Sequence, residues 1–136
     1  MEEILEKCKR GDSEGDVRVE KESGIVKVYL ASPYSHRCKK VEEDRFEAAC
    51  KAAGGLIREG FFVFSPIAHS HPIAIRCSLP KTYSFWKRYN QSWLAWADML
   101  IVLQLEGWKT SLGVKEEIIY AKEHGLIITW RDSNIE

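Results

Sequence analysis

The chain has 136 residues, which is enough for a single domain that buries roughly two thirds of the surface its unfolded form would expose. Its 20 basic and 20 acidic side chains are mixed along the sequence, so the charge pattern disfavours DNA or RNA as a partner while still allowing one nucleotide. The four cysteines form no C-x-x-C pair, and no apolar run approaches the length of a membrane span. With no signal-peptide pattern in residues 1–10, we expect a cytoplasmic protein that does not contact membranes.

Residues 1–24 are rich in Glu, Lys, Asp and Gly and offer few apolar side chains to bury. Such a composition is typical of a charged extension rather than of a packed element. We therefore predict one domain over residues 25–136, with no catalytic role for the segment before it.

Strands and helices alternate along this domain. A β-branched run at residues 25–30, ended by Ser32-Pro33, predicts a first and central strand. Apolar residues at helical spacing over residues 40–58 predict a crossover helix, and residues 61–64 form a short apolar run typical of a strand buried on both faces. Two strands joined by one helix make a right-handed βαβ unit.

Residues 67–82 contain two histidines and two prolines and have no clear period, so we predict a long loop there. A helix rich in aromatic residues over 83–97, a strand at 99–103, a helix from about 112 to 124 and a strand at 126–130 complete the pattern. The expected fold is a flavodoxin-like or Rossmann-like α/β three-layer sandwich. Its small parallel sheet has the order 2-1-3-4, with the topological switch between the first and third strands.

Residues 107–117 connect the third strand to its helix beside this switch point, where open parallel sheets bind ligands. Helical phase places Glu117 on the same face as Val114 and Ala121, whereas the adjacent Glu116 projects elsewhere. An inward carboxylate costs desolvation, which favours a functional role. The alternative is a carboxylate that only complements the helix dipole.

Ser111 and Gly113 lie at the start of the same helix. A serine N-cap followed by a glycine would leave backbone amides free to hold a phosphate. Judged by spacing alone, Ser111 and Gly113 could instead be an ordinary helix cap and turn without a ligand.

Three motifs together resemble the nucleoside 2-deoxyribosyltransferase-like superfamily, which includes 2′-deoxynucleoside 5′-phosphate N-hydrolases. These motifs are Val-Tyr-Leu-Ala-Ser-Pro-Tyr at residues 28–34, Ala97-Asp98, and Ser-x-Gly-Val-x-x-Glu at residues 111–117. Residues 64–72 and Gly107-Trp108 add a closer resemblance to a family of small bacterial and phage proteins of unassigned activity within that superfamily.

The resemblance implies a double displacement in which Glu117 attacks C1′ of a deoxyribosyl group while Tyr29 orients the carboxylate. Water or a second base then resolves the intermediate with overall retention. It also implies that Ser111 and Gly113 hold a 5′-phosphate, and Ser32, Pro33 and Tyr34 flank the same crevice as candidate substrate contacts. No cofactor is expected.

One position departs from the superfamily pattern. Eight residues before Asp98, where an Asp usually assists the nucleophile or the departing base, this chain has Asn90. Eight helical residues rise about 12 Å towards the crevice, so Asn90 is the candidate for the site and Asp98 is structural. Since Asn carries no acidic proton, His69 and His71 are candidates for protonating the base.

Other candidates have simpler alternatives. His69 and His71 with Cys77 lack the partner spacing of a zinc site, so we predict no metal, and backbone carbonyls would otherwise satisfy these histidines. Trp108 is a candidate to stack on a base, and Arg37 is a candidate phosphate contact. The tryptophans of the aromatic helix are more typical of a core or of a subunit interface, which favours a homodimer or a higher homo-oligomer.

The favoured hypothesis is an enzyme that cleaves or transfers the N-glycosidic bond of a nucleoside or nucleoside 5′-monophosphate. A nucleotide-binding module without turnover is the main alternative, because of Asn90. Cleavage of NAD or another ribonucleotide is a third possibility, since no motif marks the surroundings of the 2′ position.

Overall fold

The computed structural model describes residues 24–133, so the predicted extension over residues 1–24 lies outside the described residues except for Gly24. One parallel sheet of four strands forms the centre of the domain, and its order is β2-β1-β3-β4, as predicted. The strands are β1 (Lys27–Ala31), β2 (Phe62–Phe64), β3 (Met99–Gln104) and β4 (Ile127–Asp132). Because β1 pairs with both β2 and β3, the strand order reverses beside it, and this is the predicted switch point.

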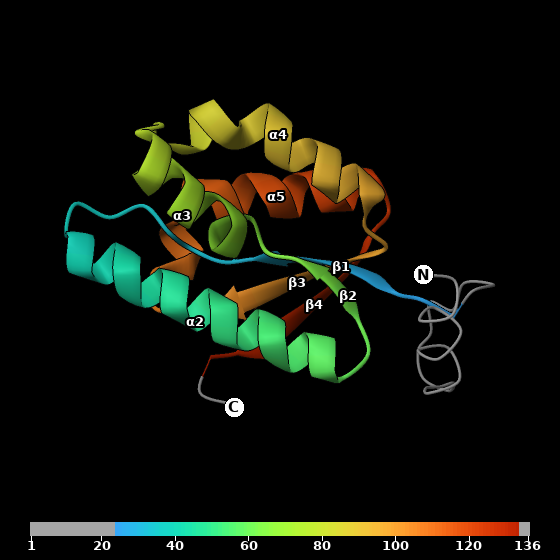
Figure 1. Ribbon diagram of the computed structural model, residues 1–136. Coiled ribbons are helices and arrows are strands. Elements are labelled where there is room, and N and C mark those ends of the chain that lie inside the picture. The colour runs from blue at the N-terminus through green and yellow to red at the C-terminus, as the bar shows by residue number, and fades with distance from the viewer. Residues whose placement is uncertain (1–23, 134–136) are drawn as a thin grey trace.

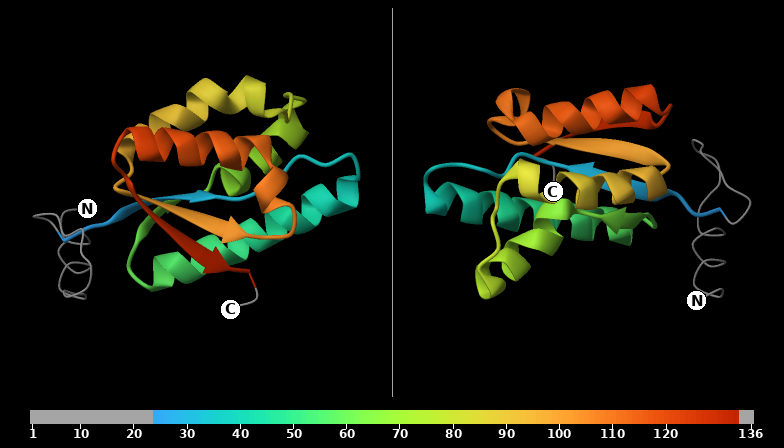
Figure 2. Two further views of the ribbon diagram at one scale, coloured as in Figure 1. Left: turned by 180° about the vertical axis from the view of Figure 1, so that it is seen from behind. Right: turned by 90° about the horizontal axis from the view of Figure 1, so that it is seen from above.

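The helices cover both faces of this sheet, which confirms the predicted three-layer α/β fold (Figure 1). They are α2 (Lys39–Arg58), α3 (Pro66–Cys77), α4 (Tyr83–Trp96) and α5 (Leu112–Glu123), with a single 3-10 turn, η1 (Trp108–Thr110), before α5. Figure 1 and the left view of Figure 2, which are seen from opposite sides, show α4 and α5 together on one face of the sheet and α2 on the other. Within residues 24–133, none of the helices has the length and apolar character that crossing a membrane requires.

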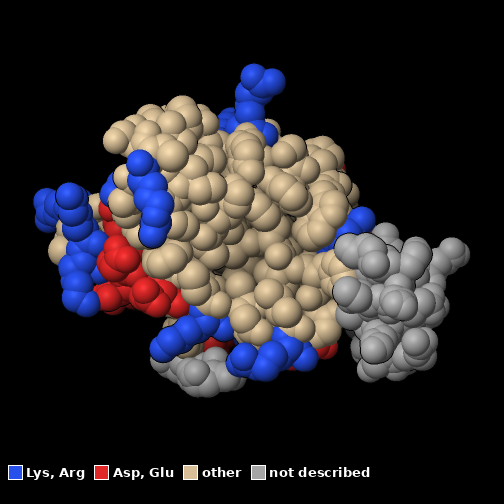
Figure 3. Space-filling view, in the orientation of Figure 1, with Lys and Arg blue, Asp and Glu red and all other residues tan. Residues whose placement is uncertain are grey.

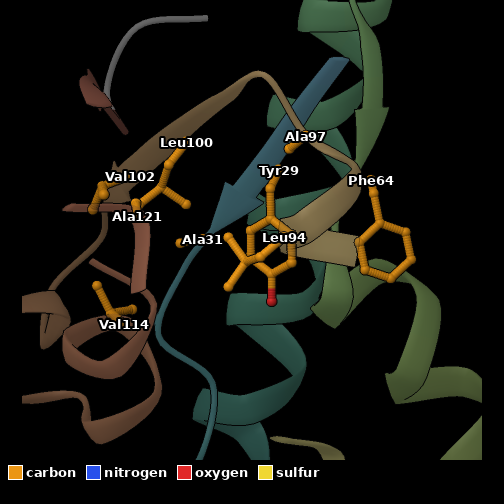
Figure 4. Packing of buried hydrophobic residues seen from close by; sticks show 9 residues of the cluster. All are labelled: Tyr29, Ala31, Phe64, Leu94, Ala97, Leu100, Val102, Val114 and Ala121. Carbon is orange, nitrogen blue, oxygen red and sulfur yellow. The ribbon is translucent and has the colours of Figure 1, made fainter. Parts of the chain in front are cut away.

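Alternate residues of β1 face the two helical layers. Tyr29 and Ala31 belong to the apolar cluster beneath α4 and α5, whereas Val28 and Leu30 belong to the cluster beneath α2. Figure 4 shows the ring of Tyr29 beside Leu94, inside the first of these clusters. The central strand is therefore buried on both faces, which is why its sequence is a continuous apolar run.

The long loop predicted over residues 67–82 is wrong for most of its length, because α3 occupies residues 66–77. The side chain of Ser65 caps this helix by accepting a hydrogen bond from the backbone N–H of Ala68 at 3.1 Å, and Pro66 takes the first helical position, where its missing N–H costs nothing. The Ser-Pro pair thus begins a helix as well as ending a strand. Pro72 lies inside this helix, and because proline normally interrupts a helix, the sequence pattern predicted a loop instead.

Asp98 lies at the amino end of β3, where its Oδ2 accepts a hydrogen bond from the backbone N–H of Lys27 at 2.9 Å. This contact joins the starts of β1 and β3 at the edge of the sheet away from the strand carboxyl ends. It is the structural role that the sequence predicts for this residue.

Charged side chains gather mostly around the edge of the face seen in Figure 3, and both signs are present there. The broad centre of that face carries neither. No single-sign surface of the kind that attracts a polyanion is seen on this face.

Two adjacent residues near the end of α2 provide a matched test of the core. Leu56 is 1% exposed beneath the sheet, whereas Ile57 is 57% exposed. We expect Leu56→Ala to lower the free energy of unfolding by about 2–5 kcal/mol, because it leaves a cavity, and Ile57→Ala to change it by less than about 1 kcal/mol. Urea denaturation of both variants is the measurement, and equal losses would contradict this packing.

Candidate active site

A cavity of about 390 Å³ opens at the switch point, beyond the carboxyl ends of β1 and β3. Its walls come from the loop after β1, the first turns of α3 and α4, and the start of α5. Six of the residues predicted for the site line it, namely Ser32, Tyr34, Asn90, Ser111, Gly113 and Glu117. These residues come from three separate segments of the chain, namely the loop after β1, α4 and the start of α5, and the fold brings them together.

A buried hydrogen bond between Tyr29 and Glu117 lies at the inner end of this cavity. Glu117 is 4% exposed on the sheet-facing side of α5, and its Oε2 accepts a hydrogen bond of 2.5 Å from the hydroxyl of Tyr29. Burial raises the pKa of Glu117 from its ordinary 4.5 to about 8, while the hydrogen bond from Tyr29 opposes that rise. Burial and the neighbouring Glu117 also raise the pKa of Tyr29, so its hydroxyl stays a donor.

Tyr83 is a cavity residue for which the sequence analysis predicted no site role. It lies in the first turn of α4, and burial, followed by the charges of Glu117 and Glu116, raises its pKa to about 12. Gly113 explains how the two helices approach: a Cβ on this glycine would lie 3.3 Å from the ring of Tyr83. No periodicity in the sequence marks this pairing, because the two residues come from different helices.

Ser111 has the geometry of an ordinary helix cap. Its Oγ accepts a hydrogen bond from the backbone N–H of Val114 at 3.2 Å. The same residue also lines the cavity, so the first turn of α5 begins at the cavity wall.

Two buried polar atoms at the cavity have no protein partner among the described residues. They are Oγ of Ser32 and Oδ1 of Asn90, which belong to residues 6% and 8% exposed. An unpaired buried polar atom costs about 1–3 kcal/mol. Both residues line the cavity, so both atoms can be satisfied by a ligand that enters it.

The outer part of the cavity is basic. Arg45 from α2 donates to the backbone carbonyls of Ser35 at 3.1 Å and Glu106 at 3.0 Å, which ties the loop after β1 to the loop after β3. Gly107 permits this contact, since it has a φ of 96° and a Cβ there would lie 2.5 Å from Nη2 of Arg45. The sequence analysis assigned no site role to Arg45, although its place early in the crossover helix puts it near the carboxyl end of β1.

Lys81 and His36 also line this basic part. Nζ of Lys81 is 2.9 Å from Oε1 of the buried Glu42, and Oε2 of the same carboxylate accepts a hydrogen bond from the backbone N–H of His36. The carboxylate therefore holds the ammonium group of Lys81 and the backbone of His36 at the loop after β1.

Six predicted site residues do not line the cavity, and one of them is Tyr29, which contacts the cavity residue Glu117. Pro33 is fully buried, and Arg37 is exposed. Trp108 packs on the apolar cluster beneath α5, with its ring 5.4 Å from that of Trp130.

The two histidines of α3 are the remaining pair. Nε2 of His69 makes a 2.7 Å hydrogen bond with the hydroxyl of Tyr89 on α4, while His71 is buried against Tyr34 and Glu43. Both rings therefore hydrogen-bond to side chains, whereas the structural alternative considered from the sequence gave them backbone carbonyls as partners. No group of three or more His, Cys, Asp or Glu among residues 24–133 is arranged to hold a metal ion.

The raised pKa of Glu117 predicts how stability depends on pH. Between about pH 4.5 and 8 the folded protein keeps a proton that the unfolded chain releases, so stability falls as pH rises through this window. Glu117→Gln removes this dependence. We therefore expect the free energy of unfolding of the variant, minus that of wild type, to increase by a few kcal/mol between pH 4.5 and pH 8. Denaturant titration at a series of pH values measures the difference. Glu116→Gln is the control, and an equal gain in that variant would contradict the prediction.

No curated protein matches this chain. The family described as a domain of unknown function (DUF1937) matches residues 26–131, which include every residue that lines the cavity. This span is more than half of the sequence, and the chain therefore belongs to the DUF1937 family.

Proposed function

We propose that the protein cleaves or transfers the N-glycosidic bond of a deoxynucleoside, nucleoside or nucleoside 5′-monophosphate through a covalent glycosyl intermediate on Glu117. One observation carries the proposal: a buried carboxyl group, oriented by the hydroxyl of Tyr29, lies in a cavity at the switch point of a parallel sheet. The sequence resemblance to the nucleoside 2-deoxyribosyltransferase-like superfamily supports the choice of reaction.

The hydrogen bond of Tyr29 determines which carboxylate oxygen is free to react. Oε2 of Glu117 accepts this bond, so Oε1 is the oxygen that we assign to attack C1′. The bond from C1′ to the base nitrogen breaks as the bond to Oε1 forms. Water or a second base then displaces Glu117, and two inversions at C1′ leave the configuration retained.

The rest of the cavity suits a nucleotide in size and in chemistry. A volume of about 390 Å³ is within the range of small-molecule sites. Ser32 and Asn90 offer unpaired polar atoms for a sugar or a base, and Arg45 and Lys81 place positive charge where a phosphate would complement it. We assign the phosphate to this basic part and to Ser111 at the start of α5.

We also propose that the protein is a homo-oligomer of the cytoplasm. Phe85 and Tyr89 on α4 are 49% and 40% exposed, and exposed aromatic side chains are enriched at subunit contacts. Cys38, Cys50 and Cys77 are free thiols, as the cytoplasm would keep them.

Asn90 supports a second candidate, a nucleotide-binding module without turnover, because an amide cannot serve as an acid. Such a protein would keep the cavity and the buried partners of Glu117. It would bind a nucleotide in calorimetry and release no base after prolonged incubation. NAD and ribonucleotides should be tested as substrates beside the deoxynucleotides, since no residue has been identified that would contact the 2′ position.

Base release from a panel of nucleoside 5′-monophosphates tests the nucleophile. We expect Glu117→Gln to slow release by about 10³-fold or more, because the amide cannot form the intermediate. The adjacent Glu116→Gln, which does not line the cavity, should stay within about threefold of wild type. Equal rates in wild type and Glu117→Gln would refute the assignment.

The pH profile tests the partnership with Tyr29. Only the ionised carboxylate attacks, so kcat/KM should rise with pH along a limb whose midpoint is at about pH 8. Tyr29→Phe removes the hydrogen bond that lowers the pKa of Glu117, so the midpoint of its profile should move to higher pH. Unchanged midpoints would mean that Tyr29 does not act through Glu117.

A further inference from the structure

A chain of three side chains runs from the cavity to the protein surface. Tyr34 lines the cavity, and its hydroxyl is 2.5 Å from Nδ1 of His71. Nε2 of His71 is 3.2 Å from Oε1 of Glu43, whose side chain is 53% exposed. His71 itself is only 4% exposed and does not line the cavity, but it contacts the cavity residue Tyr34.

Packing holds the imidazole of His71 in one orientation. Its ring stacks on Phe46 of α2 with the centroids 4.3 Å apart, and it meets Tyr34 edge to face. Both ring nitrogens have partners, with Nε2 facing Glu43 and Nδ1 facing the hydroxyl of Tyr34. The imidazolium form would donate at both positions, and the neutral form with Nε2–H would accept at Nδ1. A carboxylate, an imidazole and a hydroxyl in this order form the arrangement by which proteins move a proton to or from a hydroxyl.

The proposed reaction lacks an acid at the position where the related superfamily has Asp, because Asn90 holds no transferable proton. Among the other cavity groups, Lys81 is paired with Glu42, and Tyr83 has no titratable hydrogen-bond partner within residues 24–133 that could return its proton. Tyr34 does have such a partner. His36 also lines the cavity, with its Nδ1 accepting from the backbone N–H of Cys38, and it is the rival donor that the experiment below separates from Tyr34. Burial and the charges of Glu42 and Glu43 raise the pKa of Tyr34, so its hydroxyl holds a proton until another group exchanges one with it.

We propose that Tyr34 is the acid and then the base of the glycosyl transfer, and that His71 and Glu43 supply and take back its proton as positioning residues. This inference rests on the proposed function. In the first step the C1′–N bond breaks, Tyr34 gives its proton to the base nitrogen, and the protonated His71 returns one from Nδ1. His71 is left neutral, with its Nε2 proton still directed at Glu43.

In the second step water attacks C1′ and the bond from C1′ to Glu117 breaks. The proton of the water passes to Tyr34 as the hydroxyl proton of Tyr34 passes to Nδ1 of His71, which restores the starting state. The sum is one nucleotide and one water converted to a free base and a sugar phosphate, with no further reactant. One group thus acts in both half-reactions, as in retaining glycosidases.

The test compares two leaving groups on the same sugar phosphate. Guanine needs a proton to depart, whereas 7-methylguanine already carries a positive charge in the nucleotide and departs neutral. We expect Tyr34→Phe and His71→Asn to slow guanine release by about 10²-fold or more and 7-methylguanine release by less than about tenfold. Glu117→Gln should lose activity on both substrates, because the nucleophile is needed whatever the base.

Glu43→Gln and Glu47→Gln form a matched pair of exposed positions one turn apart on α2. Only Glu43→Gln should show a loss that depends on the leaving group. The inference is overturned if Tyr34→Phe slows the release of guanine and 7-methylguanine equally. It is also overturned if His36→Gln, and not Tyr34→Phe, slows guanine release selectively. If wild type releases neither base, the proposed function itself fails, which is a different result from an active enzyme with unselective variants.

Discussion

The hydrogen bond from Tyr29 to Glu117 is the interaction on which the rest of this site depends, because it joins the central strand to α5 inside the apolar layer. A carboxyl group buried without a partner would cost several kcal/mol, and it would be neutral at physiological pH. The tyrosine hydroxyl satisfies one oxygen and offsets part of the rise in pKa. The fold can therefore keep a carboxyl group in its core whose charge is available a little above neutral pH.

The outer half of the cavity depends on a different constraint. Parallel strands end in loops that would be free to move apart, and here the guanidinium of Arg45 holds two of them together by donating to carbonyls on both. A side chain at Gly107 would occupy the position of that guanidinium. The walls of the cavity are thus held by backbone contacts, which leaves the unpaired side-chain atoms of Ser32 and Asn90 for a ligand.

The sequence was sufficient for the sheet order, the switch point and the inward face of α5, because each follows from periodicity and from the rules of parallel sheets. It failed at α3, where Ser65-Pro66 signalled a helix start but Pro72 contradicted it. It also could not show that Tyr83 meets Gly113, that Arg45 meets Gly107, or that His71 is directed at Tyr34. Those pairs join residues from different elements, and their contacts depend on how the elements pack, which no local pattern records.

Asn90 has a physical explanation in this setting that does not require loss of function. It lines the same cavity as Glu117, and a second carboxylate there would raise the pKa of Glu117 further, because like charges oppose each other's ionisation. An amide removes that repulsion and keeps an oxygen for hydrogen bonding, at the cost of the proton that an Asp could carry. In the reaction that we propose, the proton donor would then have to be elsewhere, on a group whose charge does not act directly on Glu117. A neutral hydroxyl supplied through a buried imidazole meets that requirement, and Tyr34 with His71 is where the structure has one.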